Sequence, residues 1–218
     1  MRYALFSDIH GNQIALKTAL ADYKHRNINH YLCLGDICSD DCIDIVRNVG
    51  AKTVFGNWEV MAAAATTALI SDKSLITDNH RWQLTLPPVL KFNTFWIAHA
   101  DPIWKPNINT LQAHLAQGGF NTMTVDFPNH HTISARLKQS FALLKKENIA
   151  IFFYGHIHQQ KVWQCTDDGI IEDLPPRSFT LQPGYTYMVS IGNVGSFSDE
   201  HEPTYAIFDT ETNHVELL

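Results

Sequence analysis

Residues 2–12 read RYALFSDIHGN, and this stretch decides the fold class. Its first five residues are an apolar run typical of a buried strand, and the segment from Gly11 to His25 repeats apolar residues at helical spacing. A polar turn that carries Asp8 and His10 joins the two. A strand that passes through a polar turn into a helix is the first half of a β-α-β unit.

The same alternation continues through the first half of the chain. Residues 30–34 and 51–55 are predicted to be further buried strands, and residues 41–49 a helix with one apolar side. Residues 58–69 predict another helix, rich in Ala. This order predicts a layered α/β fold with at least partly parallel strands.

The second half is expected to be richer in strands. Residues 89–98 predict a hairpin, 132–146 a helix and 149–154 a buried strand. Short strands are expected from residue 161 onward, at 162–165, 178–182, 187–191, 204–208 and 214–217. Residues 102–129 are expected to form either a lid-like insertion or plain loops.

The composition is that of a soluble globular protein, and we expect residues 1–218 to form a single domain. The chain is 45% hydrophobic and 17% charged, and it is long enough for a substantial core. Its net charge of −6 argues against a nucleic acid or an anionic membrane as the main partner, since both favour basic surfaces. No signal peptide is visible and no apolar run approaches the roughly 20 residues of a membrane span. The four Cys form no CxxC pair, as expected for reduced thiols in a cytoplasmic protein.

Polar residues that can bind metal follow five of the predicted strands. In open α/β sheets ligands bind beyond the carboxyl ends of the strands, so these side chains are expected to meet. Carboxylate, imidazole and amide groups without thiolates suit Mn, Fe, Zn, Co or Ni. The residues are Asp8, His10, Asp36, Asn57, His99, His156 and His158.

Two pairs of these residues are separated by one position, and glycines stand beside several of them. On an extended segment, side chains two residues apart point the same way, so Asp8 and His10 are expected to reach one ion. The same holds for His156 and His158. The neighbouring glycines allow the backbone to come close to the ions and to turn sharply.

Taken in chain order, the short motifs that contain these seven residues resemble those of the calcineurin-like metallophosphoesterases. The resemblance covers nearly the whole chain and is closest to the small single-domain branch of YfcE-like phosphodiesterases and diadenosine tetraphosphatase-like proteins. The matching motifs are Asp8-x-His10, Gly35-Asp36, Gly56-Asn57, His99 and Gly155-His156-x-His158.

This resemblance implies a four-layer α/β/β/α sandwich that holds two divalent metal ions. Asp36 would bridge the ions, with Asn57 and His99 as further catalytic residues. A metal-bridging hydroxide would attack phosphorus in line, and the ions would neutralise charge on the phosphoryl oxygens. The implied ligands are Asp8, His10 and His158 for one ion, and Asn57, His99 and His156 for the other.

Trp58 departs from the family pattern. The third motif usually reads Gly-Asn-His-Asp/Glu, and its His is the expected proton donor to the leaving oxygen. Indole is a poor acid, and losing a general acid costs about 10²–10⁴ in rate, most of all for poor leaving groups. We therefore expect the substrate to be a phosphodiester or a nucleoside polyphosphate, and a phosphorylated small molecule or nucleotide in any case.

Trp58 has two interpretations, and a replacement acid has two candidates. The indole could bind substrate by stacking on a nucleobase. Packing at a helix start is the commoner role of a lone aromatic residue, so a core position is expected.

His130 and His131 could replace the missing acid, although an exposed helix start also explains them.

Other functions of the same fold stay open, and so does the oligomeric state. They are a phosphomonoesterase, a protein phosphatase and a non-catalytic interaction scaffold. Protein phosphatases of this family carry an Arg after the Gly-Asp motif and keep the His of the third motif, and this chain has neither. The complete set of seven implied ligands favours catalysis over a scaffold.

Overall fold

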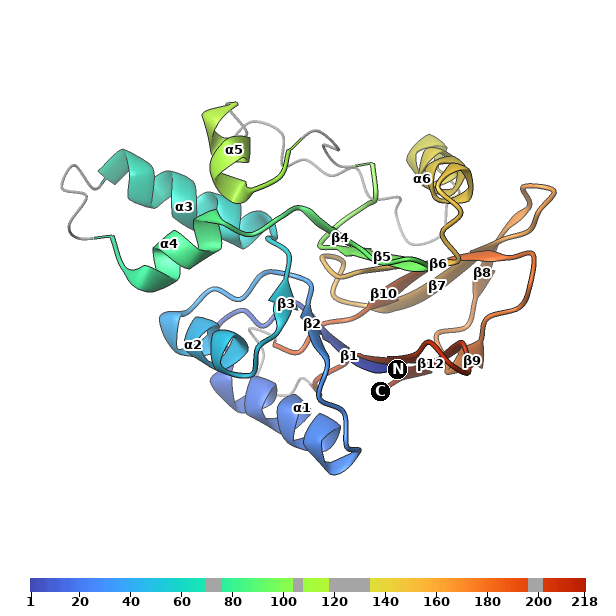
Figure 1. The fold of residues 1–218 in the computed structure, drawn as a ribbon, viewed down its shortest axis with the longest axis horizontal. Coiled ribbons are helices and arrows are strands. Elements are labelled where there is room, and N and C mark those ends of the chain that lie inside the picture. The colour runs from blue at the N-terminus through green and yellow to red at the C-terminus, as the bar shows by residue number, and fades with distance from the viewer. Residues whose placement is uncertain (70–75, 104–107, 118–133, 196–201) are drawn as a thin grey trace.

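The computed structural model describes residues 1–69, 76–103, 108–117, 134–195 and 202–218. Within these ranges two six-stranded mixed sheets lie face to face (Figure 1). The first sheet has the strand order β3-β2-β1-β11-β12-β9. Its strands are β1 (Arg2–Phe6), β2 (Tyr31–Cys33), β3 (Lys52–Thr53), β9 (Phe179–Thr180), β11 (Ala206–Asp209) and β12 (His214–Leu217).

The second sheet has the order β4-β5-β6-β10-β7-β8. In the first sheet β1, β2 and β3 are parallel and form one half, while β11, β12 and β9 pair antiparallel in the other half. In the second sheet the central strands β5, β6 and β10 are parallel, and antiparallel pairs complete both edges. The strands of the second sheet are β4 (Val89–Lys91), β5 (Phe95–Ala98), β6 (Ile151–Tyr154), β7 (Gln160–Cys165), β8 (Ile171–Leu174) and β10 (Thr186–Ile191).

Helices cover the outer faces of both sheets. α1 (Gln13–His25) and α2 (Asp40–Asn48) lie on the first sheet, and α6 (Ala135–Lys146) lies on the second (Figure 1). α3 (Asn57–Leu69), α4 (Asp78–Leu84) and α5 (Leu111–Ala116) group together at one side. No helix among the described residues is both long and apolar enough to cross a bilayer.

Alternating side chains build the layers. In β1, Ala4 and Phe6 pack against α1 and α2, while Leu5 points between the sheets. In β6, Phe153 points between the sheets and Phe152 packs toward α6. Each central strand is therefore buried on both faces, which confirms the expected α/β/β/α sandwich.

Several expected elements differ from those in the structure. The hairpin over 89–98 is confirmed, but the strand expected at 51–55 has only two residues, and the N–H of Gly56 beyond it donates to the Glu59 carboxylate rather than to β2. The helix expected from 132 begins at Ala135, with Ser134 as its N-cap. Within 102–129 the described part contains α5, and residues 104–107 and 118–129 lie outside the described residues.

Candidate metal centre

Five strand ends meet at one edge of the sandwich and bring all seven predicted ligands together. Backbone hydrogen bonds tie the loops that carry them: His10 N donates to Asp36 O at 3.0 Å, and Gly155 N donates to His99 O at 2.9 Å. His156 N donates to Asp8 Oδ2 at 2.9 Å, which joins the loops that follow β6 and β1. The carboxyl ends of strands from both sheets therefore form one site, as expected for an α/β fold.

Asp8, His10 and His158 form the first ligand group, which could hold a metal ion. The Nε2 atoms of His10 and His158 lie 2.9 Å apart. Oδ1 of Asp8 lies 3.1 Å from His158 Nε2 and 3.7 Å from His10 Nε2. Asp8 is fully buried, and among the described residues its Oδ1 accepts no hydrogen bond of good geometry. A buried carboxylate oxygen without such a donor fits a site that a cation completes.

Asp36, Asn57, His99 and His156 form the second group. His99 Nε2 lies 2.9 Å from Asn57 Oδ1 and 3.3 Å from Asp36 Oδ2. His156 Nδ1 lies 2.9 Å from the same Asn57 oxygen. The groups are contiguous, because ligand atoms of Asp8, Asp36 and His99 lie within 4.8 Å of one another and could also hold an ion.

The protonation of His99 shows what this cluster favours. Its Nδ1 lies 2.8 Å from the carbonyl oxygen of Leu34, which only accepts, so Nδ1 carries a proton and Nε2 faces the ligand atoms. Burial acts to lower the pKa of His99, but the negative charges of Asp36 and Asp8 outweigh it and raise the pKa to about 10. The cluster thus attracts positive charge at His99 Nε2, where a divalent ion fits.

The pKa values of Asp8 and His156 agree with this view, whereas contact with the Asp8 carboxylate raises the pKa of His158. Burial acts to raise the pKa of Asp8, but the nearby His99, His10 and His158 hold it well below its usual range. Burial, followed by the charge of His99, lowers the pKa of His156 to about 4, so its imidazole is neutral. Ionised carboxylates and neutral imidazoles are the forms that bind transition metals.

The predicted reason for the convergence of the paired ligands is wrong. β1 ends at Phe6, and Asp8 and His10 have φ angles of 52° and 48°, so the segment is not extended. His156 and His158 likewise follow the end of β6 with φ angles of 67° and 55°. These left-handed conformations are uncommon for residues other than glycine, and the hydrogen bonds between the loops hold them in place. The side chains converge through tight turns rather than through strand periodicity.

Glycines allow two of these loops to approach closely. A Cβ at Gly56 would lie 2.2 Å from Asp36 Oδ1, and a Cβ at Gly155 would lie 2.3 Å from Asp8 Oδ2. Both distances are far below a van der Waals contact, so the carboxylates occupy space that any side chain would fill. The backbone at these glycines therefore lies close to the carboxylates, and its approach to the ions stays a prediction.

Glu59 is the residue that the sequence analysis missed. Its carboxylate is buried and accepts three backbone hydrogen bonds, from Asp36 at 2.8 Å, Ile37 at 2.7 Å and Gly56 at 2.7 Å. Burial and the charge of Asp36 raise the pKa of Glu59, against the effect of the three donors. The sequence did contain a signal for this role. Glu59 stands three residues after Gly56, which precedes α3, and an acid at that position is the second half of a capping box.

Trp58 is not a core residue, so the packing expectation is wrong. It is 38% exposed, and its ring stands edge-on to the ring of His10 with centroids 5.7 Å apart. Its backbone N–H donates to Asp36 Oδ1 at 2.8 Å, so the residue lies at the centre itself. A role in binding substrate stays a prediction. The two candidate replacement acids, His130 and His131, lie outside the described residues.

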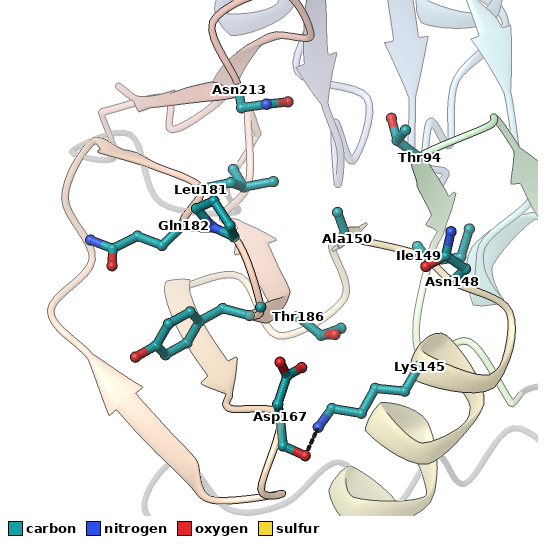
Figure 2. A pocket seen from close by; sticks show the side chains of 13 residues that line it. Thr94, Lys145, Asn148, Ile149, Ala150, Asp167, Leu181, Gln182, Thr186 and Asn213 are labelled. Atoms are coloured by element: carbon teal, nitrogen blue, oxygen red, sulfur yellow. Dashed lines mark hydrogen bonds between the residues drawn. The ribbon is translucent and has the colours of Figure 1, made fainter.

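A pocket of about 510 Å³ lies away from this centre (Figure 2). Its lining includes Thr94, Ala150 and Thr186, which stand at the amino ends of β5, β6 and β10. The predicted ligands follow the opposite ends of β5 and β6. At its edge Lys145 Nζ donates to the backbone oxygen of Asp167 at 3.2 Å, so this cation is engaged by the chain itself (Figure 2).

Comparison with known proteins identifies the family to which this site belongs. A family model described as the calcineurin-like phosphoesterase superfamily domain matches residues 1–213. The chain belongs to this superfamily. Calcineurin-like phosphoesterases are metal-dependent hydrolases of phosphoesters, and in this chain Asp8 with His10 and His158, or Asp8 with Asp36 and His99, could hold a metal ion.

Individual relatives are distant in sequence but share the fold. A metallophosphoesterase from Sphaerobacter thermophilus has a TM-score of 0.68 at 19% identity, over 100% of this chain and 87% of its own. A structure described as a novel archaeal phosphodiesterase has a TM-score of 0.52 at 15% identity, over 100% of this chain and 99% of its own. Uncharacterized protein MJ0912 of Methanocaldococcus jannaschii is 23% identical over 236 residues, 99% of this chain and 85% of the relative. The two structural likenesses agree with the fold of the calcineurin-like phosphoesterases.

Proposed function

We propose that this calcineurin-like phosphoesterase holds two divalent transition-metal ions and hydrolyses a phosphodiester or a nucleoside polyphosphate. The convergence of carboxylate, imidazole and amide ligand atoms from five strand ends carries the proposal. Asp36 is the bridging residue in this account. The proposed ligands are Asp8, His10 and His158 for one ion and Asn57, His99 and His156 for the other.

The donor set fits such ions. Oxygen and nitrogen ligands without thiolate suit Mn, Fe, Zn, Co or Ni. When bound, a pair of such ions polarises the phosphoryl oxygens and supplies a water nucleophile of lowered pKa. The chain's own contribution is to fix the ligands before substrate arrives, through the Leu34 carbonyl on His99 and the Glu59 carboxylate on the Asp36 loop.

Trp58 narrows the choice of substrate. Its indole N–H does not ionise at neutral pH, so residue 58 provides no proton to the leaving oxygen. Losing such an acid costs roughly 3–5 kcal/mol of barrier when the leaving group is a poor one. Weakly basic leaving groups, such as a nucleotide phosphate or an aryl alcohol, need little protonation. A phosphoanhydride, or a diester with a weakly basic leaving group, fits this chemistry.

Hydrolysis of two chromogenic esters tests the proposal. Mn²⁺-reconstituted protein is expected to cleave bis(p-nitrophenyl) phosphate faster than p-nitrophenyl phosphate. Asp36→Asn removes a charge at the centre and is expected to abolish both activities. Asp168→Asn makes the same chemical change in an exposed turn and is expected to retain both. Faster cleavage of the monoester, or equal loss in both variants, would contradict the proposal.

A further inference from the structure

We propose that Cys38 is a positioning residue that orients the imidazole of His10 toward the first metal ion, an inference that rests on the proposed metal centre. Cys38 Sγ lies 3.6 Å from Nδ1 of His10. In the proposed tautomer His10 Nδ1–H donates to the sulfur, which is a weak acceptor. Cys38 is exposed, whereas the side chain of His10 is 1% exposed.

The other nitrogen of His10 explains why the tautomer matters. Nε2 faces His158 Nε2 at 2.9 Å and Asp8 Oδ1 at 3.7 Å, so it is the nitrogen directed at the first ligand group. An imidazole nitrogen binds a metal only through a lone pair, and therefore the proton of neutral His10 belongs on Nδ1. A hydrogen-bond acceptor on that side fixes both the tautomer and the ring orientation.

The second ligand group uses the same device with a different acceptor. Nδ1 of His99 meets the carbonyl oxygen of Leu34 at 2.8 Å, and its Nε2 faces Asn57 and Asp36. The two imidazoles thus present the same nitrogen to the centre. A carbonyl supports His99, and a thiol occupies the corresponding place behind His10.

The backbone around Cys38 aims the sulfur. Cys38 has a φ of 75°, a left-handed conformation that is costly for a residue other than glycine. It is held between two anchored neighbours. Ile37 N donates to Glu59 Oε1 at 2.7 Å, and Ser39 caps α2 by accepting from Cys42 N. Strained conformations persist where the surroundings determine them, and this one places Sγ against the His10 ring.

The buried Oδ1 of Asp8 independently points to a ligand at this place. It lies in the first ligand group, is fully buried and accepts no hydrogen bond of good geometry from the described residues. A cation held by Asp8 and His10 together would satisfy it. The orientation of the His10 ring then determines how well the group binds that cation.

Two substitutions at Cys38 and one matched control test the inference. Cys38→Ala removes the acceptor. Cys38→Asn offers an amide oxygen and is a residue that tolerates the left-handed backbone. Cys42→Ala removes a thiol four residues away that packs in the core beneath α2. Thermal unfolding of each metal-free variant is measured first, to establish that the variant is folded.

The first readout is the tautomer of His10 in metal-free protein, measured from imidazole ¹⁵N chemical shifts. We expect the proton on Nδ1 in the wild type and in Cys42→Ala, and a redistribution toward Nε2 in Cys38→Ala. The second readout is Mn²⁺ affinity by chelator competition. Cys38→Ala is expected to weaken it about 10- to 100-fold, as is usual for the supporting partners of metal ligands. Cys38→Asn is expected to restore most of it.

The inference is overturned if wild-type His10 carries its proton on Nε2, or if Cys38→Ala binds Mn²⁺ as tightly as the wild type does. Failure of the proposed function has a different signature. A wild-type protein that binds no Mn²⁺ removes the metal centre, whereas the tautomer of His10 and its response to Cys38→Ala still report on the contact.

Discussion

The carboxylate of Glu59 accepts a hydrogen bond from the backbone N–H of Asp36 at 2.8 Å. The same carboxylate binds the N–H groups of Ile37 and Gly56, so it joins the loop after β2 to the start of α3. A group outside the proposed ligand set thus holds two proposed ligands, Asp36 and Asn57, in register. A glutamine at this position cannot do the same, because its NH₂ group is a donor where the carboxylate has an acceptor oxygen.

Glu59→Gln is therefore expected to lower the free energy of unfolding. The new NH₂ group faces backbone N–H donors, and each buried amide left without an acceptor costs about 1–3 kcal/mol. Urea denaturation of the metal-free protein measures this. Glu147→Gln makes the same change at an exposed position after α6 and is expected to have little effect. Equal stability of the two variants would remove the anchoring role of Glu59.

Trp58→His is expected to extend hydrolysis to substrates with poor leaving groups. An imidazole beside Asp36 can donate the proton that indole withholds, and general acid catalysis contributes about 10²–10⁴ in rate. We expect kcat/KM to rise for diesters with an alkyl alcohol leaving group and to change little for bis(p-nitrophenyl) phosphate. Trp58→Phe is the control, since it keeps an aromatic ring without an acid. A similar gain with Phe would show that the indole limits access rather than proton transfer.

Gly155→Ala is expected to disturb the centre by steric pressure. The added methyl group would overlap Ser7 Oγ and Asp8 Oδ2, which lie 2.0 and 2.3 Å from the Cβ position. Overpacking of this kind costs about 1–3 kcal/mol and would displace a proposed ligand. Chemical denaturation and Mn²⁺ titration measure the two effects.

Gly169→Ala separates crowding from backbone strain. Gly169 has a φ of +83° and open space around its Cβ position, so an Ala there costs about 1 kcal/mol of strain without touching the centre. It is expected to destabilise the protein while leaving Mn²⁺ affinity unchanged. Unchanged affinity in Gly155→Ala as well would contradict the close approach to Asp8.

The architecture was predictable because burial leaves continuous apolar runs in central strands and a helical period in helices. β1 and β6 are apolar on both faces, so their positions and those of the polar turns that follow them could be read directly. The meeting of the seven proposed ligands was predictable for the same reason, since each of them follows such a run. β8 and α4 were missed because β8 is a largely polar strand at a sheet edge, and α4 has seven residues, too few for a clear helical period.

The geometry of the centre was less predictable. Side-chain patterns carry little information on φ at residues such as Asp8 and His158, where hydrogen bonds between distant loops impose left-handed turns. The exposure of Trp58 depends in the same way on its tertiary neighbours, because it begins a helix whose start lies against Asp36 and His10. Local sequence specifies which residues meet, and the contacts between loops specify how they point.

The central claim is that the seven side chains hold a pair of ions, and metal content tests it most directly. Apoprotein is loaded with Mn²⁺, freed of unbound metal and measured by elemental analysis, with Asp36→Asn alongside. We predict about two equivalents per chain in the wild type, as a two-metal centre requires, and fewer in the variant. One equivalent or none in folded wild-type protein would contradict the two-metal centre.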